Sequence, residues 1–274
     1  MIGAILGDVA GSAYEFSPNK SKDFELFADR NGKKCYCTDD SMMTLAVADA
    51  LLNAKEDFSD LSDQTVISMQ KIGRDHPHAG YGGRFFSWIF ERNPKAYRSY
   101  GNGAAMRVSP CAYAANSLEQ ALYLSDCVTK VTHDHPEGIK AARAVTACIY
   151  LALRGESKEV ILSHVRENYY PLDKTLDEIR PEYSFDVTCM GSVPESIQCF
   201  AEAESLEESI RNAVSLGGDA DTMAAIAGSI AEAFYGVSEE MERIAAKYII
   251  EADNYYGIQP YLIDIFLDFR YKYM

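Results

Sequence analysis

Residues 3–16 read GAILGDVAGSAYEF, a stretch of small and apolar residues whose only charged side chains are Asp8 and Glu15. Its three glycines recur every four residues, so a helix at this place would carry them on one face. A glycine face lets two backbones approach closely, and we therefore expect this helix to pack tightly against a neighbour. Asp8 and Glu15 are seven residues apart and share a face of the same helix. That face is either a solvent-exposed stripe or, as the glycines favour, one at or near the interior.

Apolar residues at three- and four-residue spacing continue along most of the chain, whereas alternating β-branched runs of strand length are nearly absent. This pattern predicts an all-α protein of about ten or more helices. Neither an internal repeat nor a linker rich in Ser, Pro or Gly divides the chain, so we expect a single domain over residues 1–274. The predicted helices cover residues 40–54, 117–130, 135–154, 191–204, 219–235, 238–251 and 258–271, with irregular connections near 17–37, 74–83, 93–103 and 169–190.

Composition limits the classes of function. The 274 residues are 47% hydrophobic, which suffices for a substantial core, and their net charge of −15 opposes binding to a nucleic-acid backbone. No run reaches the roughly 18 apolar residues of a membrane span, and the apolar N-terminus has no basic leader, so we expect no membrane partner and no targeting segment. Seven scattered cysteines, an odd number, indicate a reducing, cytoplasmic location. Cys35 and Cys37 lack the further ligands of a zinc site.

Carboxylates gather in two motifs that lie far apart in the chain, TDD at residues 38–40 and GGDADT at residues 217–222. Each motif stands at the start of a predicted helix. A single Asp at such a place is commonly an N-cap, which stabilises a helix by about 1 kcal/mol. Capping accounts for one carboxylate per helix, whereas each motif has two carboxylates and a threonine hydroxyl. Paired helix caps and a metal site both remain open, and the pattern favours a metal site.

A metal site follows if the two motifs meet in space. At an effective dielectric constant of 20, one pair of like charges about 4 Å apart costs on the order of 4 kcal/mol, so four converging carboxylates need cations. Oxygen ligands without histidine or cysteine suit Mg²⁺, Mn²⁺ or Ca²⁺ rather than Zn²⁺.

Five motifs together resemble one known family. In chain order they are GAILGDVAGSAYEF (3–16), TDDSMM (38–43), SYGNGAAMRVSP (99–110), VTHDHPEGIKAA (131–142) and GGDADT (217–222). In this combination the chain is similar, from about residue 3 to residue 235, to the ADP-ribosylglycohydrolase family, which includes the dinitrogenase reductase-activating glycohydrolase and the ADP-ribosyl-acceptor hydrolases.

The resemblance implies a compact orthogonal multi-helix bundle with a central cleft that holds a dinuclear Mg²⁺ or Mn²⁺ centre, and ADP-ribose or an ADP-ribosylated substrate as the partner. At such a centre we expect Glu15 to be the catalytic general acid or base, helped by Asp39 or Asp40, because Glu15 is the one carboxylate there that is not required as a fixed ligand. By motif position, the implied metal ligands are Glu15, Thr38, Asp39, Asp40, Asp219, Asp221 and Thr222. The implied substrate-binding residues are Asp39, Arg98, Ser99, Tyr100, Gly101, Asn102, Gly103 and His133.

The physical chemistry of the substrate loop agrees with these roles and also allows simpler ones. Around Gly101 and Gly103, small residues let backbone N–H groups approach phosphate oxygens, and a helix in the following AAMRV would present its N-terminus to an anion. Taken alone, Asn-Gly is first of all a turn signal. His133 precedes a helix, and capping by Asp134 or a partly buried histidine is the structural alternative to a catalytic imidazole.

Residues 79–83, AGYGG, bear on the linkage that is cleaved. Family members that release ADP-ribose from arginine carry an Asp-Ile-Gly type segment at the corresponding place, downstream of the Asp-Asp pair. This chain has no carboxylate there and looks more like the branch that cleaves O-glycosidic links, serine-linked or polymeric. The alternatives are hydrolysis of arginine-linked ADP-ribose, a non-catalytic binding or structural member of the fold, and a His-Asp metal phosphohydrolase built on His133, Asp134 and His76.

Overall fold

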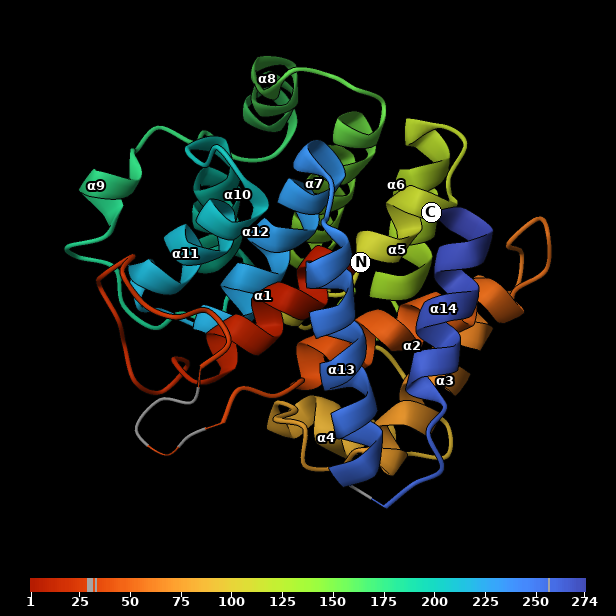
Figure 1. The fold of residues 1–274 in the computed structure, drawn as a ribbon. Coiled ribbons are helices and arrows are strands. Elements are labelled where there is room, and N and C mark those ends of the chain that lie inside the picture. The colour runs from red at the N-terminus through yellow and green to blue at the C-terminus, as the bar shows by residue number, and fades with distance from the viewer. Residues whose placement is uncertain (29–31, 33, 256) are drawn as a thin grey trace.

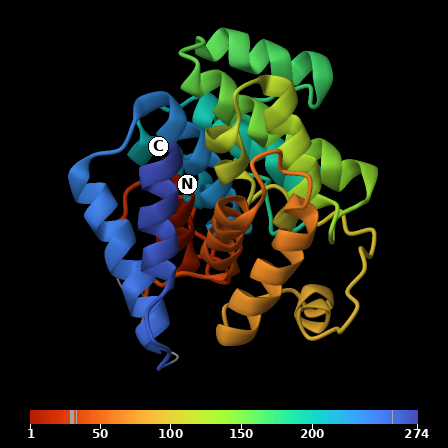
Figure 2. The same cartoon turned by 90° about the vertical axis from the view of Figure 1, so that its right-hand side faces the viewer.

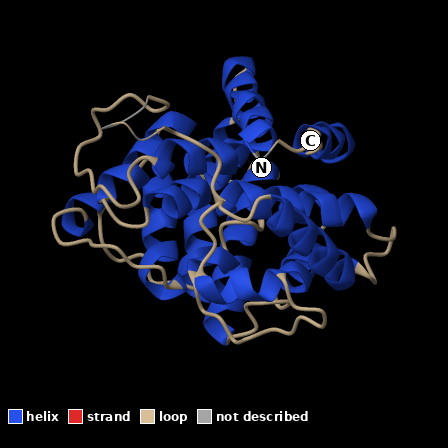
Figure 3. Cartoon of the chain, turned by 90° about the horizontal axis from the view of Figure 1, so that it is seen from below, coloured by secondary structure: helices blue, strands red, loops and turns tan. Residues whose placement is uncertain are grey.

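The computed structural model describes all residues except 29–31, 33 and 256, and the regular secondary structure of the described part is helical, with long loops between several helices (Figure 1, Figure 3). The helices are α1 (Ile2–Ser12), α2 (Asp39–Asn53), α3 (Leu61–Asp75), α4 (Gly83–Ile89), the 3₁₀ turn η1 (Asn102–Ala104), α5 (Ser109–Ala114), α6 (Leu118–Thr129), α7 (Pro136–Leu153), α8 (Lys158–Asn168), α9 (Leu176–Ile179), α10 (Cys189–Ala201), α11 (Leu206–Leu216), α12 (Ala220–Tyr235), α13 (Glu239–Tyr255) and α14 (Leu262–Tyr273).

The all-α prediction is confirmed. Each of the seven predicted helices overlaps an observed one, α2, α6, α7, α10, α12, α13 or α14, with ends that agree to about one helical turn. Within the described residues, the only β-type pairing is an isolated bridge between Gly101 and Thr188. Two of the predicted connections are shorter than expected, because α3 continues to Asp75 and because α9 lies within residues 169–190.

Helix α1 crosses the centre of the molecule and packs along α12, the most extensive helix contact in the fold (Figure 1). The glycines of α1 make this contact possible. A Cβ added at Gly3, Gly7 or Gly11 would overlap the backbone of α12. Both helices are buried along nearly their whole length. The predicted close approach of this helix is therefore confirmed, and the start of α12 lies beside the end of α1.

Helix α1 ends at Ser12, so the prediction that one helix carries both Asp8 and Glu15 is wrong at its C-terminal end. The amide of Tyr14 donates to the carbonyl of Gly11 at 2.7 Å, a bond that tightens the last turn. Glu15 lies in the turn that follows and is half-buried. Its position is thus set by a turn rather than by the helix face that it would share with Asp8.

Helices α13 and α14 form a pair at one side of the molecule, against α1 and α2 (Figure 2). The buried Asp253 of α13 ties this pair to α3. One carboxylate oxygen of Asp253 lies 3.2 Å from His76 Nε2, and the other accepts the amides of Tyr261 and Leu262 at 3.0 Å. In the described residues, no helix has the length and apolar character needed to cross a membrane.

Replacing Gly7 with alanine should destabilise the protein by about 3 kcal/mol or more, since the new methyl group would overlap the backbone of Ala224 and neither helix can move aside alone. Urea denaturation followed by circular dichroism measures the change in the free energy of unfolding. Gly83→Ala is the control, because its added Cβ meets open space, and it should change stability by no more than about 1 kcal/mol. Equal effects at both positions would contradict the proposed role of the glycine face.

Candidate metal centre

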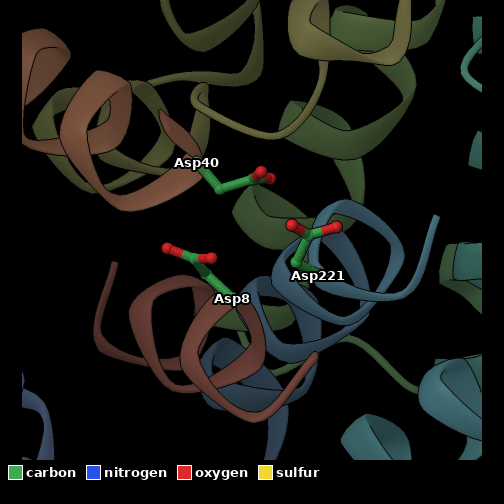
Figure 4. A group of neighbouring side chains, drawn as sticks. All are labelled: Asp8, Asp40 and Asp221. Carbon is green, nitrogen blue, oxygen red and sulfur yellow. The ribbon is translucent and has the colours of Figure 1, made fainter. Parts of the chain in front are cut away.

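The two acidic motifs meet at the centre of the fold. Asp40, near the start of α2, and Asp221, near the start of α12, lie with Asp8 of α1 in one group whose carboxylate oxygens are within 4.8 Å of one another (Figure 4). A second group of the same kind contains Glu15, Asp219 and Asp221. The hydroxyl of Thr222 donates to Asp40 Oδ2 at 3.0 Å and so joins the two motifs directly.

Helix capping accounts for only part of this arrangement. Thr38 is the N-cap of α2 and its hydroxyl accepts the amide of Asp40 at 3.3 Å. Asp219 stands at the N-cap of α12, yet its side chain makes no capping hydrogen bond. Asp219 instead accepts a hydrogen bond from Asn102 Nδ2 at 2.7 Å. The aspartates thus face one another and the neighbouring loop, so paired helix caps do not explain them.

Asp8 is a site residue that sequence reasoning did not assign. Its carboxylate is buried and accepts the amide and hydroxyl of Thr38 at 2.9 and 2.7 Å. It also accepts the amide of Ser41 at 3.0 Å and the hydroxyl of the same residue. The available signal was a charged residue in an otherwise apolar helix, seven positions before Glu15.

Burial and mutual repulsion raise the pKa values of these carboxyl groups. Burial, the largest cause in each case, raises the pKa of Asp8 to about 6 and, with the charges of Asp8 and Asp219, that of Asp39 to about 8. Burial and neighbouring carboxylates hold the pKa values of Asp40 and Asp221 well above the ordinary range. Without compensating positive charge, the cluster would therefore hold protons near neutral pH.

The chemistry of the donors fits hard divalent cations. Asp40 Oδ1 is buried and has no hydrogen-bond partner, an oxygen that a cation could satisfy. In the described part of the chain, both candidate groups consist of carboxylates alone, with neither histidine nor cysteine. Such oxygen ligands suit Mg²⁺ or Mn²⁺. Asp221 belongs to both groups, so two neighbouring cations could share it.

A cavity of about 400 Å³ opens above the carboxylates. Its floor includes Glu15, Asp39, Asp40, Asp219 and Asp221, and its wall includes part of the predicted substrate loop, namely Ser99, Gly101, Asn102 and Gly103, together with His133. The structure therefore brings most of the predicted site residues together around one pocket.

Arg98 and Tyr100 do not line this cavity. Arg98 is exposed, has a positive φ of 53°, and donates its amide to Asp134 Oδ1 at 2.6 Å. The ring of Tyr100 packs edge-on against His135, with centroids 5.3 Å apart. The side chains of Arg98 and Tyr100 therefore lie outside the pocket, although Ser99 between them lines it.

The loop from Tyr100 to Gly103 is held by the segment of residues 187–189. The amide of Asn102 donates to Val187 at 2.8 Å, and the carbonyl of Tyr100 accepts the amide of Cys189 at 2.8 Å. The predicted helix in AAMRV (104–108) is wrong. A 3₁₀ turn forms at Asn102–Ala104 and α5 begins only at Ser109, because the amides of Ala104 and Ala105 bond three residues back.

The predicted cap of α7 is also corrected. His135, not Asp134, is the N-cap, and its ring nitrogen accepts the amide of Glu137 at 3.2 Å. Asp134 is instead engaged with Arg98, as described above. The His-Asp phosphohydrolase alternative fails, since the ring nitrogens of His76 face the carbonyl of Ile72 and the carboxylate of Asp253, and neither candidate metal group among the described residues contains a histidine.

Several other residues of the pocket wall were not predicted. They are bulky or cationic side chains from segments that are scattered along the chain, namely Phe16, Arg84, Phe85, Tyr97, Arg107, Phe185 and Val187. Phe16 and Phe185 lie with ring centroids 6.0 Å apart. Phe16 and Arg107 lie within two of the five sequence motifs, which gave neither of them a role, whereas only tertiary packing brings the other residues to this wall.

Comparison with known proteins agrees with this arrangement. The family model described as ADP-ribosylglycohydrolase matches residues 1–250. ADP-ribosylhydrolase ARH3 of Mus musculus is 28% identical, and the alignment covers 88% of this chain and 84% of that protein; the Homo sapiens protein of the same name is 27% identical, covering 88% and 86%. ADP-ribosylarginine hydrolase Tri1 of Pseudomonas putida (strain GB-1) is 26% identical, covering 89% of this chain and 73% of that protein.

A solved structure titled "ADP-ribosylglycohydrolase-related protein complex" has the same fold, with a TM-score of 0.71, 23% identity, and coverage of 100% of this chain and 97% of that chain. The family match extends over the helices that supply both acidic motifs and the glycine loop. The chain therefore belongs to the ADP-ribosylglycohydrolase family.

Proposed function

We propose that this protein hydrolyses the glycosidic bond between ADP-ribose and an O-linked acceptor, of the serine-linked or polymeric type, with two Mg²⁺ or Mn²⁺ ions. The observation that carries the proposal is that two carboxylate clusters share Asp221, and that Glu15, Asp40, Asp219 and Asp221 of these clusters line the same pocket as the glycine loop. The family match and the names of the ADP-ribosyl hydrolases among its relatives support the same activity.

The proposed metal ligands are Glu15, Thr38, Asp39, Asp40, Asp219, Asp221 and Thr222. We assign Asp8 a positioning role instead, because donors from Thr38 and Ser41 already occupy both of its oxygens. Asp8 would hold the start of α2 so that Asp40 faces Asp221. When bound, the ions would supply Lewis acidity, orienting ribose hydroxyls and lowering the pKa of a water molecule.

The residues of the chain divide the remaining work. Glycosidic cleavage passes through an oxocarbenium-like transition state, in which the leaving group needs a proton and the attacking water must lose one. We assign these proton transfers, to the leaving group and from the water, to Glu15, assisted by Asp39 or Asp40. Glu15 lies on a turn, is half-buried and lines the pocket floor, where a ligand can reach it. The Gly101–Gly103 backbone and His133 would bind the diphosphate.

The wall formed by Gly80, Gly82, Gly83 and Arg84 supports an O-linked acceptor. An arginine acceptor would place a guanidinium group at the pocket, and a carboxylate in this wall would pair with it. The wall instead offers three glycines and the guanidinium of Arg84, which donates to the carbonyl of Tyr97 at 2.6 Å. Like charges repel, so this wall favours an uncharged acceptor.

Hydrolysis of arginine-linked ADP-ribose is the second candidate, and the similarity to ADP-ribosylarginine hydrolase Tri1 is the observation in its favour. A non-catalytic role is less well supported, since every carboxylate and hydroxyl that the family resemblance implies is present in this chain.

Removing divalent ions should abolish turnover. With ADP-ribosylated peptide as substrate, treatment with EDTA and desalting should lower the rate by at least about a hundredfold, and added Mg²⁺ or Mn²⁺ should restore it. Product ADP-ribose is measured by liquid chromatography. An unchanged rate after chelation would exclude the two-ion mechanism.

Glu15→Gln should lower kcat by about 10² to 10⁴, the range for loss of a general acid or base, while ADP-ribose binds with nearly unchanged affinity. Isothermal titration calorimetry supplies the binding constant. Glu25→Gln, at an exposed glutamate in the same segment, is the matched control and should keep the wild-type rate. A fully active Glu15→Gln enzyme would remove Glu15 from the chemistry.

Ion binding should stabilise the protein more at high pH than at low pH. Asp8 and Asp39, with pKa values of about 6 and about 8 in the ion-free fold, hold protons more tightly than unfolded carboxyls near pKa 3.9, so their contribution to stability falls as pH rises from about 4 to 8. Ions must displace those protons. Saturating Mg²⁺ should therefore raise Tm by about 5–10 °C at pH 8 and by less than about 2 °C at pH 5.5.

Differential scanning fluorimetry measures this Tm shift at the two pH values, with Asp221→Asn as the variant that should lose the effect. A larger shift at pH 5.5 would contradict it.

Serine-linked ADP-ribosyl peptide should be hydrolysed with a kcat/KM at least about tenfold above that of the matched arginine-linked peptide. The reason is that the wall formed by residues 80 and 82–84 contains no carboxylate that could pair with the guanidinium group of an arginine. Parallel assays on the two peptides, with the same sequence around the modified residue, measure the ratio. The opposite ratio would establish the second candidate function.

A further inference from the structure

His133 sits at the back wall of the pocket, with its two ring nitrogens in different surroundings. Nε2 faces the glycine loop: a Cβ added at Gly103 or Gly101 would lie 3.5 or 3.7 Å from it. Nδ1 faces the interior, 2.7 Å from the hydroxyl oxygen of Thr132 and 3.5 Å from Nη2 of Arg107. All three side chains are buried, so protein groups rather than bulk water decide where the imidazole carries its proton.

We propose that Arg107 and Thr132 are positioning residues that fix His133 as a neutral imidazole with its proton on Nε2, aimed at an anionic phosphate oxygen above the Gly101–Gly103 loop. The ligand in this inference rests on the proposed function. The position of the proton does not, because it follows from hydrogen bonds within the chain.

Counting donors gives the proton position. The guanidinium of Arg107 can only donate, and its Nη2 donates to Thr132 Oγ1 at 2.7 Å. The Thr132 hydroxyl has one proton of its own, and His133 Nδ1 is the acceptor within reach. A proton on Nδ1 would leave that hydroxyl without this acceptor and would point an N–H at the guanidinium. Nδ1 is therefore the acceptor, and the proton is on Nε2.

The charges around the ring oppose the imidazolium form. Burial, with the guanidinium groups of Arg107 and Arg84, holds the pKa of His133 well below its usual range. The other titratable ring beside it is Tyr97, whose centroid lies 6.1 Å away and whose pKa burial raises to about 12, so it adds no negative charge near neutral pH. The Nε2 donor consequently stays unchanged over the pH range in which a free histidine would titrate.

Backbone hydrogen bonds hold Thr132 and His133 in place. The amides of Thr132 and His133 both donate to the carbonyl of Thr129 at the end of α6, at 3.2 and 2.9 Å. The carbonyl of Thr132 accepts the amide of Tyr97 at 3.2 Å. Arg107 follows the 3₁₀ turn of the glycine loop, so one cation connects the loop to the histidine that faces it.

Long-range ¹H–¹⁵N NMR spectra of the ligand-free protein test the proton position directly. The His133 signals are assigned by their loss in His133→Gln. We expect an unprotonated Nδ1 and a protonated Nε2, unchanged between pH 5.5 and 8. A protonated Nδ1, or titration within that range, would overturn the inference whether or not the protein is an ADP-ribosyl hydrolase.

Binding of ADP-ribose, measured by calorimetry, tests what the proton does. A glutamine amide nitrogen can take the place of Nε2, whereas an asparagine amide nitrogen can take the place of Nδ1. His133→Gln should therefore bind ADP-ribose within about fivefold of wild type, and His133→Asn should bind it about tenfold or more weakly.

Thr132→Val should also weaken binding about tenfold, whereas Thr132→Ser keeps the hydroxyl and should stay within about twofold of wild type. The reverse order for either pair would refute the role of Nε2. If wild type binds no ADP-ribose, the proposed function fails, and the NMR spectra still decide the inference.

Discussion

Repulsion among buried carboxylates is the constraint around which this structure is built. Asp8, Asp40 and Asp221 converge from three helices, and Glu15 and Asp219 join them at the pocket floor. At an effective dielectric constant of about 20, each like-charge pair near 4 Å costs on the order of 4 kcal/mol. This cost exceeds the stabilisation of about 1 kcal/mol that a helix N-cap contributes. A cluster of this kind lowers stability unless cations bind, so its presence indicates function rather than packing.

The glycine face of α1 produces that convergence. A Cβ at Gly11 would overlap Asp221 itself, and one at Gly7 would overlap Ala224 one turn further along α12. With any larger side chains at these positions, the axes of α1 and α12 would separate, and Asp8 and Asp221 would separate with them. A feature that looks like tight packing therefore also sets the distance between site residues. The rest of the α12 face, rich in alanine, continues the same close contact toward its C-terminal end.

Sequence patterns predicted what depends on local chemistry and missed what depends on tertiary contact. Helical periodicity located seven helices, and the doubled carboxylates at two helix starts predicted the aspartates at the pocket floor. Both signals depend only on residues that are close together in the sequence. Asp8 was missed because one acidic residue in an apolar helix looks the same whether it faces solvent or a buried hydroxyl. The helix end at Ser12 and the 3₁₀ turn at Asn102 are choices between alternatives that differ little in energy, which neighbouring segments decide. Arg84, Phe85, Phe185 and Arg107 reach one pocket from separate segments, and periodicity carries no information about such meetings.

An acidic chain that binds an anionic ligand must supply positive potential without neutralising its own metal ligands. A lysine or arginine directed at the floor would pair with Asp219 or Asp221 and compete with the ions for them. The pocket instead turns a neutral donor, the ring of His133, toward the glycine loop, and the guanidinium groups of Arg84 and Arg107 are held elsewhere. Arg84 donates to the carbonyl of Tyr97, and Arg107 donates to Thr132 behind the histidine. The carboxylates thus stay available to divalent cations. Arg107 still contributes, because a cation behind an imidazole opposes its protonation and polarises its remaining N–H toward the cavity.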